Sequence, residues 1–260
     1  MMESVNSILI FFILIFFRIS GIFFFSPFFS NQAINAKLRV GFSFFVSFLL
    51  LNIVPKDETI ISNINFLLLT VLVLKELMIG GLIGFFLLIV FSIVQTASQI
   101  YSMNMGLMMA NAFDPMNQSQ SPVLGQMKNL FLLGIFFAYG IHRIIIFRLI
   151  DSFYHSPVGA ITYSIDNITY FFIKNFSYYF LLAVQFSLPI IGVLLLTDFI
   201  LGVLSRIAPQ MNVFFIGMPL KLLIGFFILI KFAPYFVNFF VIIFEKINLN
   251  LLELIKVISA

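Results

Sequence analysis

The segment from Gly106 to Gln126, GLMMANAFDPMNQSQSPVLGQ, decides what kind of fold this chain can adopt. It is rich in methionine, is broken by Pro115 and Pro122, and lies between two long hydrophobic stretches. A loop facing lipid inside a bilayer would leave backbone N–H and C=O groups without hydrogen-bond partners. The segment must therefore lie in water, inside protein or along a protein-lined passage. We expect a gate or seal, and an ordinary surface loop between two helices is the competing interpretation.

The composition of the whole chain is that of a membrane protein. Of its 260 residues, 62% are hydrophobic and 9% are charged, and the mean hydropathy is +1.16. These values exclude an ordinary soluble globular domain. The formal net charge is +4 and there is no polybasic run, so we expect no nucleic-acid partner. The absence of cysteine excludes disulfides and thiolate metal sites.

Hydrophobic segments long enough for helices that cross a bilayer divide the chain. A bilayer core of about 30 Å needs roughly 20 helical residues. We expect an all-α polytopic membrane protein with about six long hydrophobic helices, partly kinked because Pro189, Pro219 and Pro234 fall inside them. The segments lie near residues 7 to 29, 38 to 54, 66 to 100, 123 to 150, 168 to 204 and 213 to 244.

The third segment carries two patterns within its apolar sequence. Gly80 and Gly84 form a small-xxx-small pattern, which lets helices approach closely but does not identify the partner. Farther along, polar residues recur every three or four positions on one helical face, and such a face should meet a partner or water. Hydrogen bonding inside the protein is the alternative. The polar residues are Ser92, Gln95, Gln99 and Ser102.

Two further stretches are amphipathic. Residues 142 to 160, HRIIIFRLIDSFYHSPVGA, interrupt an apolar run with charges and end at Ser156-Pro157 and Gly159. We expect this stretch to lie at an interface. Residues 245 to 260, EKINLNLLELIKVISA, have apolar residues at helical spacing and predict a short amphipathic helix.

Several charged residues fall within or beside the hydrophobic segments. Each would cost roughly 2.5 to 3.5 kcal/mol if it faced lipid at a helix centre. For Lys75, Glu76 and Asp198 we expect buried polar contacts with other helices or subunits. Lys174 and Lys231 can instead extend to the headgroups. The distribution of basic residues also fails the positive-inside rule, so either the span count is wrong by one or several helices belong to a protein assembly.

The sequence offers almost no chemistry that would support catalysis. His142 and His155 are the only histidines, and they lack the spacing of a zinc site. There is no Walker loop, no GxSxG elbow and no dinucleotide fingerprint. An intramembrane aspartyl protease would need a second aspartate to match Asp198. We therefore expect no enzyme, no cofactor and no bound metal.

Methionine is the residue type that stands out in the loop. Five of these residues lie close together, and methionine is flexible and polarizable, so such a cluster can close around surfaces of varying shape. Core packing is the alternative, but Gly106 and the pair Asp114-Pro115 break the sequence as a packed helix would not. The cluster favours a seal around a passing chain. Its members are Met103, Met105, Met108, Met109 and Met116.

Four stretches, in order along the chain, carry a resemblance to a known family. They are the loop itself, GIHRIII at 140 to 146, SFYHSPVG at 152 to 159, and SRIAPQMNVFFIGMPLKLLIGF at 205 to 226. The chain resembles the FliR family of flagellar export-gate proteins over essentially its whole length. The part from Arg206 to Lys221 is the most specific. Injectisome counterparts share the architecture, and the flagellar form is the closer match.

The resemblance implies a subunit of a type III protein export gate. Members of the family form the gate with FliP and FliQ, in association with FlhB and FlhA, in the bacterial inner membrane at the flagellar basal body. The gate exports unfolded flagellar proteins. The resemblance also implies a FliP-like four-helix portion at residues 1–165 and a FliQ-like helical hairpin at residues 166–260. Helices packed in such an assembly would account for charges that do not suit lipid.

The resemblance further implies roles for particular residues. The family's plug loop corresponds to residues of about 103–124, and the hairpin turn lies between the last two helices. The residues expected in the plug are Met105, Gly106, Met108, Met109, Phe113, Asp114, Pro115, Met116 and Asn117. The residues expected at the hairpin turn are Arg206, Pro209, Gln210 and Asn212.

Two other classes of protein stay in consideration. A secondary transporter or channel also uses broken helices and intramembrane charges, but it should show inverted repeats and a midplane site, and the sequence shows neither. A structural membrane scaffold would organise a gate without lining it.

Overall fold

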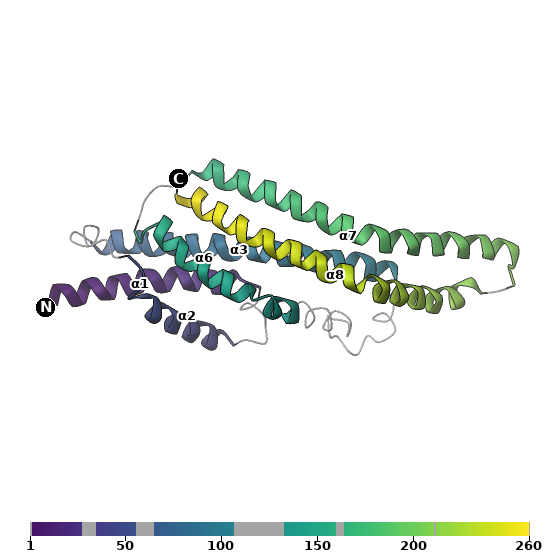
Figure 1. Ribbon diagram of the computed structural model, residues 1–260, viewed down its shortest axis with the longest axis horizontal. Helices are drawn as coiled ribbons and strands as arrows, with labels where there is room; N and C mark the ends of the chain where they lie inside the picture. Colours follow the sequence, from purple (N-terminus) through teal and green to yellow (C-terminus); the bar gives the residue numbers. More distant parts are fainter. Residues whose placement is uncertain are drawn as a thin grey trace. The chain divides into compact units, whose positions relative to one another are not determined.

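The computed structural model describes residues 2–27, 35–55, 65–106, 133–159, 164–210 and 212–259. No strand occurs in these ranges, so the predicted all-α class is confirmed. A further helical stretch covers residues 133–138. The named helices are α1 (Met2–Phe25), α2 (Ala36–Leu50), α3 (Phe66–Asn104), α6 (Ile141–His155), α7 (Ile165–Ile207) and α8 (Val213–Ser259) (Figure 1).

Four of the described helices are long and apolar enough to cross a membrane, judged by length and composition alone. Three of them have 39, 43 and 45 residues, about twice the roughly 20 residues that one crossing needs. Helices of that length must tilt strongly or extend beyond the hydrocarbon core. By contrast, α2 has 15 residues. The four stretches are Ser7–Phe25, Phe66–Asn104, Ile165–Ile207 and Phe215–Ser259, as expected for a polytopic membrane protein.

The fourth predicted segment, residues 123 to 150, is not one continuous helix. Within its described part, the helical stretch 133–138 is followed by a turn at Tyr139 and Gly140. The φ angle of Gly140 is 65°, a conformation that a Cβ atom disfavours and glycine adopts freely. The prediction of a single span was wrong here, because Gly140 ends one helix and α6 begins at the next residue.

The predicted C-terminal amphipathic helix is helical, but it is not a separate element. The last residues continue α8 without a break to Ser259. One face of this part is buried, and its residues recur every three or four positions, as on one side of a helix. They are Ile247, Asn250, Leu251, Leu254, Ile255 and Ile258. Likewise, α7 continues through Pro189, and α8 continues through Pro219 and Pro234.

The chain divides into two compact units, each formed from separate stretches. Unit 1 comprises Met1–Phe91, His142–Phe176 and Glu245–Ala260, and unit 2 comprises Ser92–Ile141 and Ser177–Phe244. Three of the long helices, α3, α7 and α8, contribute to both units. The N-terminal and C-terminal ends of the described chain therefore both belong to unit 1.

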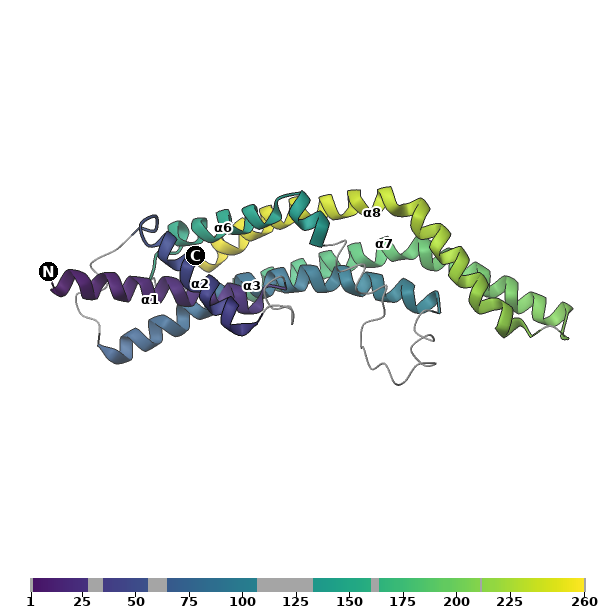
Figure 2. The same cartoon turned by 90° about the horizontal axis from the view of Figure 1, so that it is seen from below.

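In unit 1, α1 packs directly against the first half of α3 (Figure 2). Glycines on both helices allow this close approach. A Cβ atom at Gly84 would lie 2.8 Å from the carbonyl oxygen of Ile22, and a Cβ atom at Gly80 would overlap the carbonyl of Arg18. On α1, a Cβ atom at Gly21 would lie 2.5 Å from a carbonyl oxygen of α3. The partner of the small-xxx-small pattern is therefore α1 of the same chain.

The core of unit 2 is built from α3, α7 and α8. Its fully buried cluster joins the end of α3 to the middle of the other two helices. Aromatic contacts extend the cluster, since the ring of Phe186 on α7 stacks on Phe239 of α8 at 4.2 Å between centroids. The buried residues are Tyr101, Met105, Ile190, Leu194 and Ile228. In this unit α7 and α8 therefore pack together as the two arms of a hairpin.

Candidate functional site

The described part of the chain includes only the beginning of the predicted plug loop. Met105 and Gly106 directly follow the last helical residue of α3, Asn104. The other predicted plug residues lie outside the described ranges, so their role stays a prediction. They are Met108, Met109, Phe113, Asp114, Pro115, Met116 and Asn117.

Met105 is completely buried, with 0% of its surface exposed. Its neighbours in the buried cluster come from all three helices of the unit 2 core, with Tyr101 on α3 and Ile190 and Leu194 on α7. Its backbone N–H donates to the carbonyl of Tyr101 at 3.0 Å, which continues the helical pattern. Met105 is thus the last residue held in the helical hydrogen-bond pattern of α3.

Gly106 turns the chain away from the helix. Its φ angle is +79°, in the left-handed region where glycine commonly ends helices. Its N–H donates to the carbonyl of Met103 at 3.0 Å. The predicted loop therefore begins at a fixed turn next to a buried side chain.

The polar face predicted on the second half of α3 points away from the core of the chain. Ser92, Gln95 and Gln99 are exposed, whereas Ala97 and Tyr101 on the opposite side are buried. Ser102 is half-buried, and its hydroxyl donates to the carbonyl of Ser98 at 2.6 Å. This agrees with the expectation that the face meets water or a partner. Because no charge interrupts it, the face can donate and accept hydrogen bonds without favouring either sign of charge.

The predicted hairpin turn lies where α7 ends and α8 begins. Arg206 is exposed near the end of α7, and Pro209 and Gln210 form a turn. The carbonyl of Asn212 accepts a hydrogen bond from the N–H of Phe215 at 3.0 Å, at the start of α8. These residues form one end of the hairpin, and their exposure leaves them available to a neighbouring molecule.

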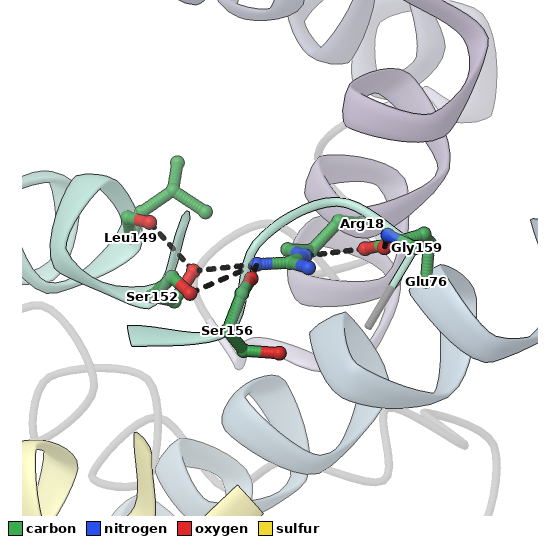
Figure 3. A network of polar contacts seen from close by, with 6 residues as sticks. All are labelled: Arg18, Glu76, Leu149, Ser152, Ser156 and Gly159. Carbon is green, nitrogen blue, oxygen red and sulfur yellow. Dashed lines mark hydrogen bonds and ion pairs between the residues drawn. The ribbon is translucent and has the colours of Figure 1, made fainter. Parts of the chain in front are cut away.

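Unit 1 contains a buried ion pair, shown in Figure 3. The Nε of Arg18 on α1 donates to Oε2 of Glu76 on α3 at 2.5 Å, and neither side chain is exposed. The Nη1 of Arg18 also donates to the carbonyls of Ser152 and Ser156 at 3.0 Å each. The other carboxylate oxygen, Oε1, accepts from the N–H of Gly159 at 3.1 Å. The guanidinium group lies 4.3 Å from the ring centre of Phe153.

This network connects three separate parts of the chain. Arg18 comes from α1, Glu76 from α3, and the remaining groups from the end of α6 and the turn that follows it. Removing two charges from water is costly unless the pair is well aligned and further hydrogen bonds surround it. Here backbone groups provide those hydrogen bonds. The sequence predicts a buried polar contact for Glu76, but no sequence signal identified Arg18 as its partner.

The other predicted polar residues differ in their surroundings. Lys75, next to Glu76, is only 8% exposed. Asp198 forms an ion pair with Lys221 across the hairpin in unit 2, yet 43% of its side chain is exposed. Asp198 therefore contacts another helix of this chain, and its side chain is only partly buried here. A contact between Asp198 and another subunit stays a prediction.

The two lysines expected near the headgroups are exposed. Lys174 on α7 pairs with Glu253 on α8 at 3.1 Å, with 53% of the lysine side chain exposed. The Nζ of Lys231 lies 5.8 Å from the ring centre of Phe227. His142 and His155 stand at opposite ends of α6. In the described ranges, no three His, Cys, Asp or Glu side chains group as metal ligands would.

Comparison with known proteins gives one consistent picture. Residues 9–247 match the family described as "Bacterial export proteins, family 1". The flagellar biosynthetic protein FliR of Bacillus subtilis (strain 168) is 30% identical, over 88% of this chain and 88% of that protein. FliR of Escherichia coli (strain K12) is 28% identical, over 89% of this chain and 87% of its own length. The surface presentation of antigens protein SpaR of Shigella flexneri is 31% identical, over 87% of this chain and 86% of that protein.

Proposed function

This chain belongs to family 1 of the bacterial export proteins, and we propose that it is a subunit of the flagellar type III protein export gate. In this role it forms and seals the conduit through which unfolded flagellar proteins leave the cell. The observation that carries the proposal is the match to FliR over nearly the whole of both chains. A match of that extent covers the long helices and the loop together, rather than a single shared motif.

The seal is assigned to the loop at residues of about 103–124. Its start is held between α3, α7 and α8, because Met105 is buried among residues of all three helices. A loop that blocks a passage must start from a fixed position, which the packing of Met105 provides. Its methionines can adapt their shape to the passage or to a substrate. Displacement of the loop would then open the conduit.

The gate partners proposed for this chain are FliP and FliQ, with FlhB and FlhA associated. Large apolar side chains support a location among lipid and other subunits, because monomeric soluble proteins rarely expose so many. Examples are Phe199 and Phe215, which are 71% and 76% exposed. We place the gate in the bacterial inner membrane at the flagellar basal body.

We also propose that residues 1–165 correspond to a FliP-like portion and residues 166–260 to a FliQ-like hairpin. The start of α7 at Ile165 supports a boundary at this point, since the hairpin arms α7 and α8 both follow it. The chain is a passive component in this view. Its sequence contains no nucleotide-binding motif, so the energy for export comes from elsewhere in the machinery.

The sealing role is tested by shortening residues 110–120 and measuring ion leakage across the membrane of cells with assembled gates. We expect leakage to rise, because the shortened loop cannot reach across the conduit. A variant of unchanged length, with the same residues replaced by glycine and serine, separates the effect of loop length from that of the side chains, among which Met116 is the one methionine. Copurification of FliP and FliQ with each variant shows that the gate has assembled. Unchanged leakage in an assembled gate rejects the sealing role.

The similarity to SpaR makes an injectisome gate the second candidate. Expression in a flagellated bacterium that lacks its own FliR separates the two candidates. Restored motility supports the flagellar assignment, and failure to restore it despite membrane insertion favours the injectisome. Crosslinking of an exported protein to Met108 or Phe113 separates a lining subunit from a scaffold that stands outside the conduit.

A further inference from the structure

Met105 is the one predicted plug residue whose side chain the described ranges place in the protein core. A residue that seals a passage must face the passage, but Met105 is 0% exposed and lies among buried residues of α3, α7 and α8. Its position therefore suits a different task from that of a sealing side chain.

The structure shows why methionine fits at this position. The side chain of Met105 lies against Gly225 of α8, in unit 2. A Cβ atom at Gly225 would lie 2.7 Å from Cγ of Met105 and 2.9 Å from its Sδ, and it would overlap the terminal methyl group as well. Separations below 3.0 Å do not occur between a Cβ atom and such neighbours. Glycine at residue 225 therefore leaves the space that the methionine fills.

Met105 has little freedom to move out of this space. Ile190, Leu194 and Ile228 are themselves 0%, 0% and 7% exposed, so packed side chains surround the space. The terminal methyl group of a methionine adapts easily. Its Cγ atom is attached directly to Cβ, so it moves only with a change of rotamer or backbone. Adding a side chain at residue 225 would therefore push on the backbone of α3 at its last turn.

That last turn determines where the loop starts. The N–H of Met105 donates to Tyr101 and the N–H of Gly106 donates to Met103, at 3.0 Å each. Immediately afterwards the chain turns at Gly106, with φ of +79°. The side chain that fills the space at Gly225 thus belongs to the last residue before the chain leaves the helix.

We propose that Met105 and Gly225 form an anchor, in which Met105 is a positioning residue that fixes the start of the loop to the α7–α8 hairpin. The sealing surface then belongs to residues farther along the loop. This inference rests on the proposed function of the loop. It adds that a displacement of α8 at Gly225 is transmitted to the first residue of the loop.

A double-mutant cycle tests the contact in the full-length chain purified in detergent. Hydrogen–deuterium exchange of the Met105 and Gly106 amides reports whether the last turn of α3 is held in place. We expect Gly225→Ala to speed this exchange about tenfold, because the added methyl group overpacks the space that Met105 fills. In the Met105→Ala background the overlapping Cγ, Sδ and Cε atoms are absent, so the same Gly225→Ala substitution should slow the exchange or leave it unchanged.

Two control variants isolate the contact from general effects. Gly192→Ala makes the same change inside α7, where a Cβ atom meets nothing within 4 Å. Met78→Ala truncates a methionine of α3 that is 66% exposed. Neither control should alter the exchange at Met105 and Gly106. The anchor is refuted if Gly225→Ala acts alike in both backgrounds or leaves the exchange unchanged in the presence of Met105.

Ion leakage in cells with assembled gates then separates an anchor from a seal. For an anchor, Met105→Ala and Gly225→Ala each raise leakage and speed the amide exchange, and Gly225→Ala adds nothing further in the Met105→Ala background. If Met105 were a sealing residue, Met105→Ala would raise leakage without changing the amide exchange, and residue 225 would have no influence. If the proposed function is wrong, shortening residues 110–120 leaves leakage unchanged. The double-mutant cycle in amide exchange would still show whether Met105 packs against Gly225.

Discussion

The guanidinium of Arg18 and the carboxylate of Glu76 form an ion pair in which neither side chain is exposed to solvent. The pair joins α1 to α3, and backbone groups at the end of α6 and in the turn after it add further hydrogen bonds. Such a pair is costly to form and still more costly to break, since removal of one partner leaves an uncompensated charge.

Replacement of Glu76 by leucine should destabilise unit 1 by about 3–5 kcal/mol, because Arg18 would remain buried without its counter-charge. The double variant Arg18→Met and Glu76→Leu should recover a large part of that loss. Thermal unfolding of the purified chain in detergent measures both effects. Lys174→Gln is the control, because its ion pair with Glu253 is exposed and such pairs contribute at most about 1 kcal/mol. A double variant less stable than Glu76→Leu would contradict this account.

Gly84→Ala should separate α1 from α3. Its Cβ atom would lie 2.8 Å from the backbone oxygen of Ile22, and a backbone atom cannot yield as a side chain does. We expect a loss of about 1–3 kcal/mol from overpacking. Gly41→Ala on α2 is the matched control, because nothing lies within 4 Å of a Cβ atom there. Proteolysis of membrane-embedded protein measures the difference, and equal resistance of the two variants would refute the close crossing.

Asn175 and Asn250 should set the alignment of α7 against α8 in unit 1. Both are 5% exposed, and Nδ2 of Asn250 donates to Oδ1 of Asn175 at 2.6 Å. A buried amide pair favours one alignment of two helices over others. We expect Asn175→Leu to permit shifted alignments at a cost of about 1–3 kcal/mol from the unpaired amide.

Crosslinking of introduced cysteines with bifunctional thiol reagents can measure this alignment cleanly, because the natural chain contains no cysteine. Cysteines introduced at Lys174 and Glu253 should be joined efficiently in the parent chain by a bifunctional thiol reagent about as long as the two side chains that they replace, since the ends of those side chains already meet. In the Asn175→Leu background, crosslinks to positions one turn away should increase. An unchanged pattern of crosslinks would show that apolar packing alone sets the alignment.

The ion pair of Asp198 and Lys221 should contribute little to the isolated chain. Their side chains are 43% and 22% exposed, so we expect Asp198→Asn to cost less than about 1 kcal/mol in detergent. In the proposed gate, where neighbouring subunits can exclude water, the same change should reduce copurification of the proposed partners FliP and FliQ. Exchange of the two charges, Asp198→Lys with Lys221→Asp, should restore it if the pair matters by itself. No recovery would indicate that Asp198 contacts another subunit.

The sequence predicted the class of fold because composition and segment length are local properties. Runs of apolar residues of bilayer length require helices in lipid, and the all-α class follows from that. Boundaries were less certain. The hydrophobicity of residues 123 to 150 suggested one span, but a turn at Gly140 divides it. The tail from residue 245 looked separate, yet no helix-ending signal precedes it and α8 continues to Ser259.

The candidate site was predictable only in part. The methionine-rich segment after the third hydrophobic stretch and the hairpin turn near Pro209 could be located from local composition and from the family resemblance. That Met105 faces the core was not predictable, because a flexible apolar side chain suits a seal and a core equally well. The glycine opposite it, Gly225, gave no signal of its own in a helix that contains other glycines.

By itself, the sequence determined that this protein is a helical membrane protein, placed a sulfur-rich loop between its hydrophobic segments, and carried its family resemblance. Only the tertiary structure decided which distant residues meet, such as Arg18 with Glu76 and Met105 with Gly225. The physical reason lies in the range of the interactions. Helix formation depends on neighbouring residues and on the bilayer. Which residue pairs with a buried charge, or fills the space beside a glycine, depends instead on how the helices cross.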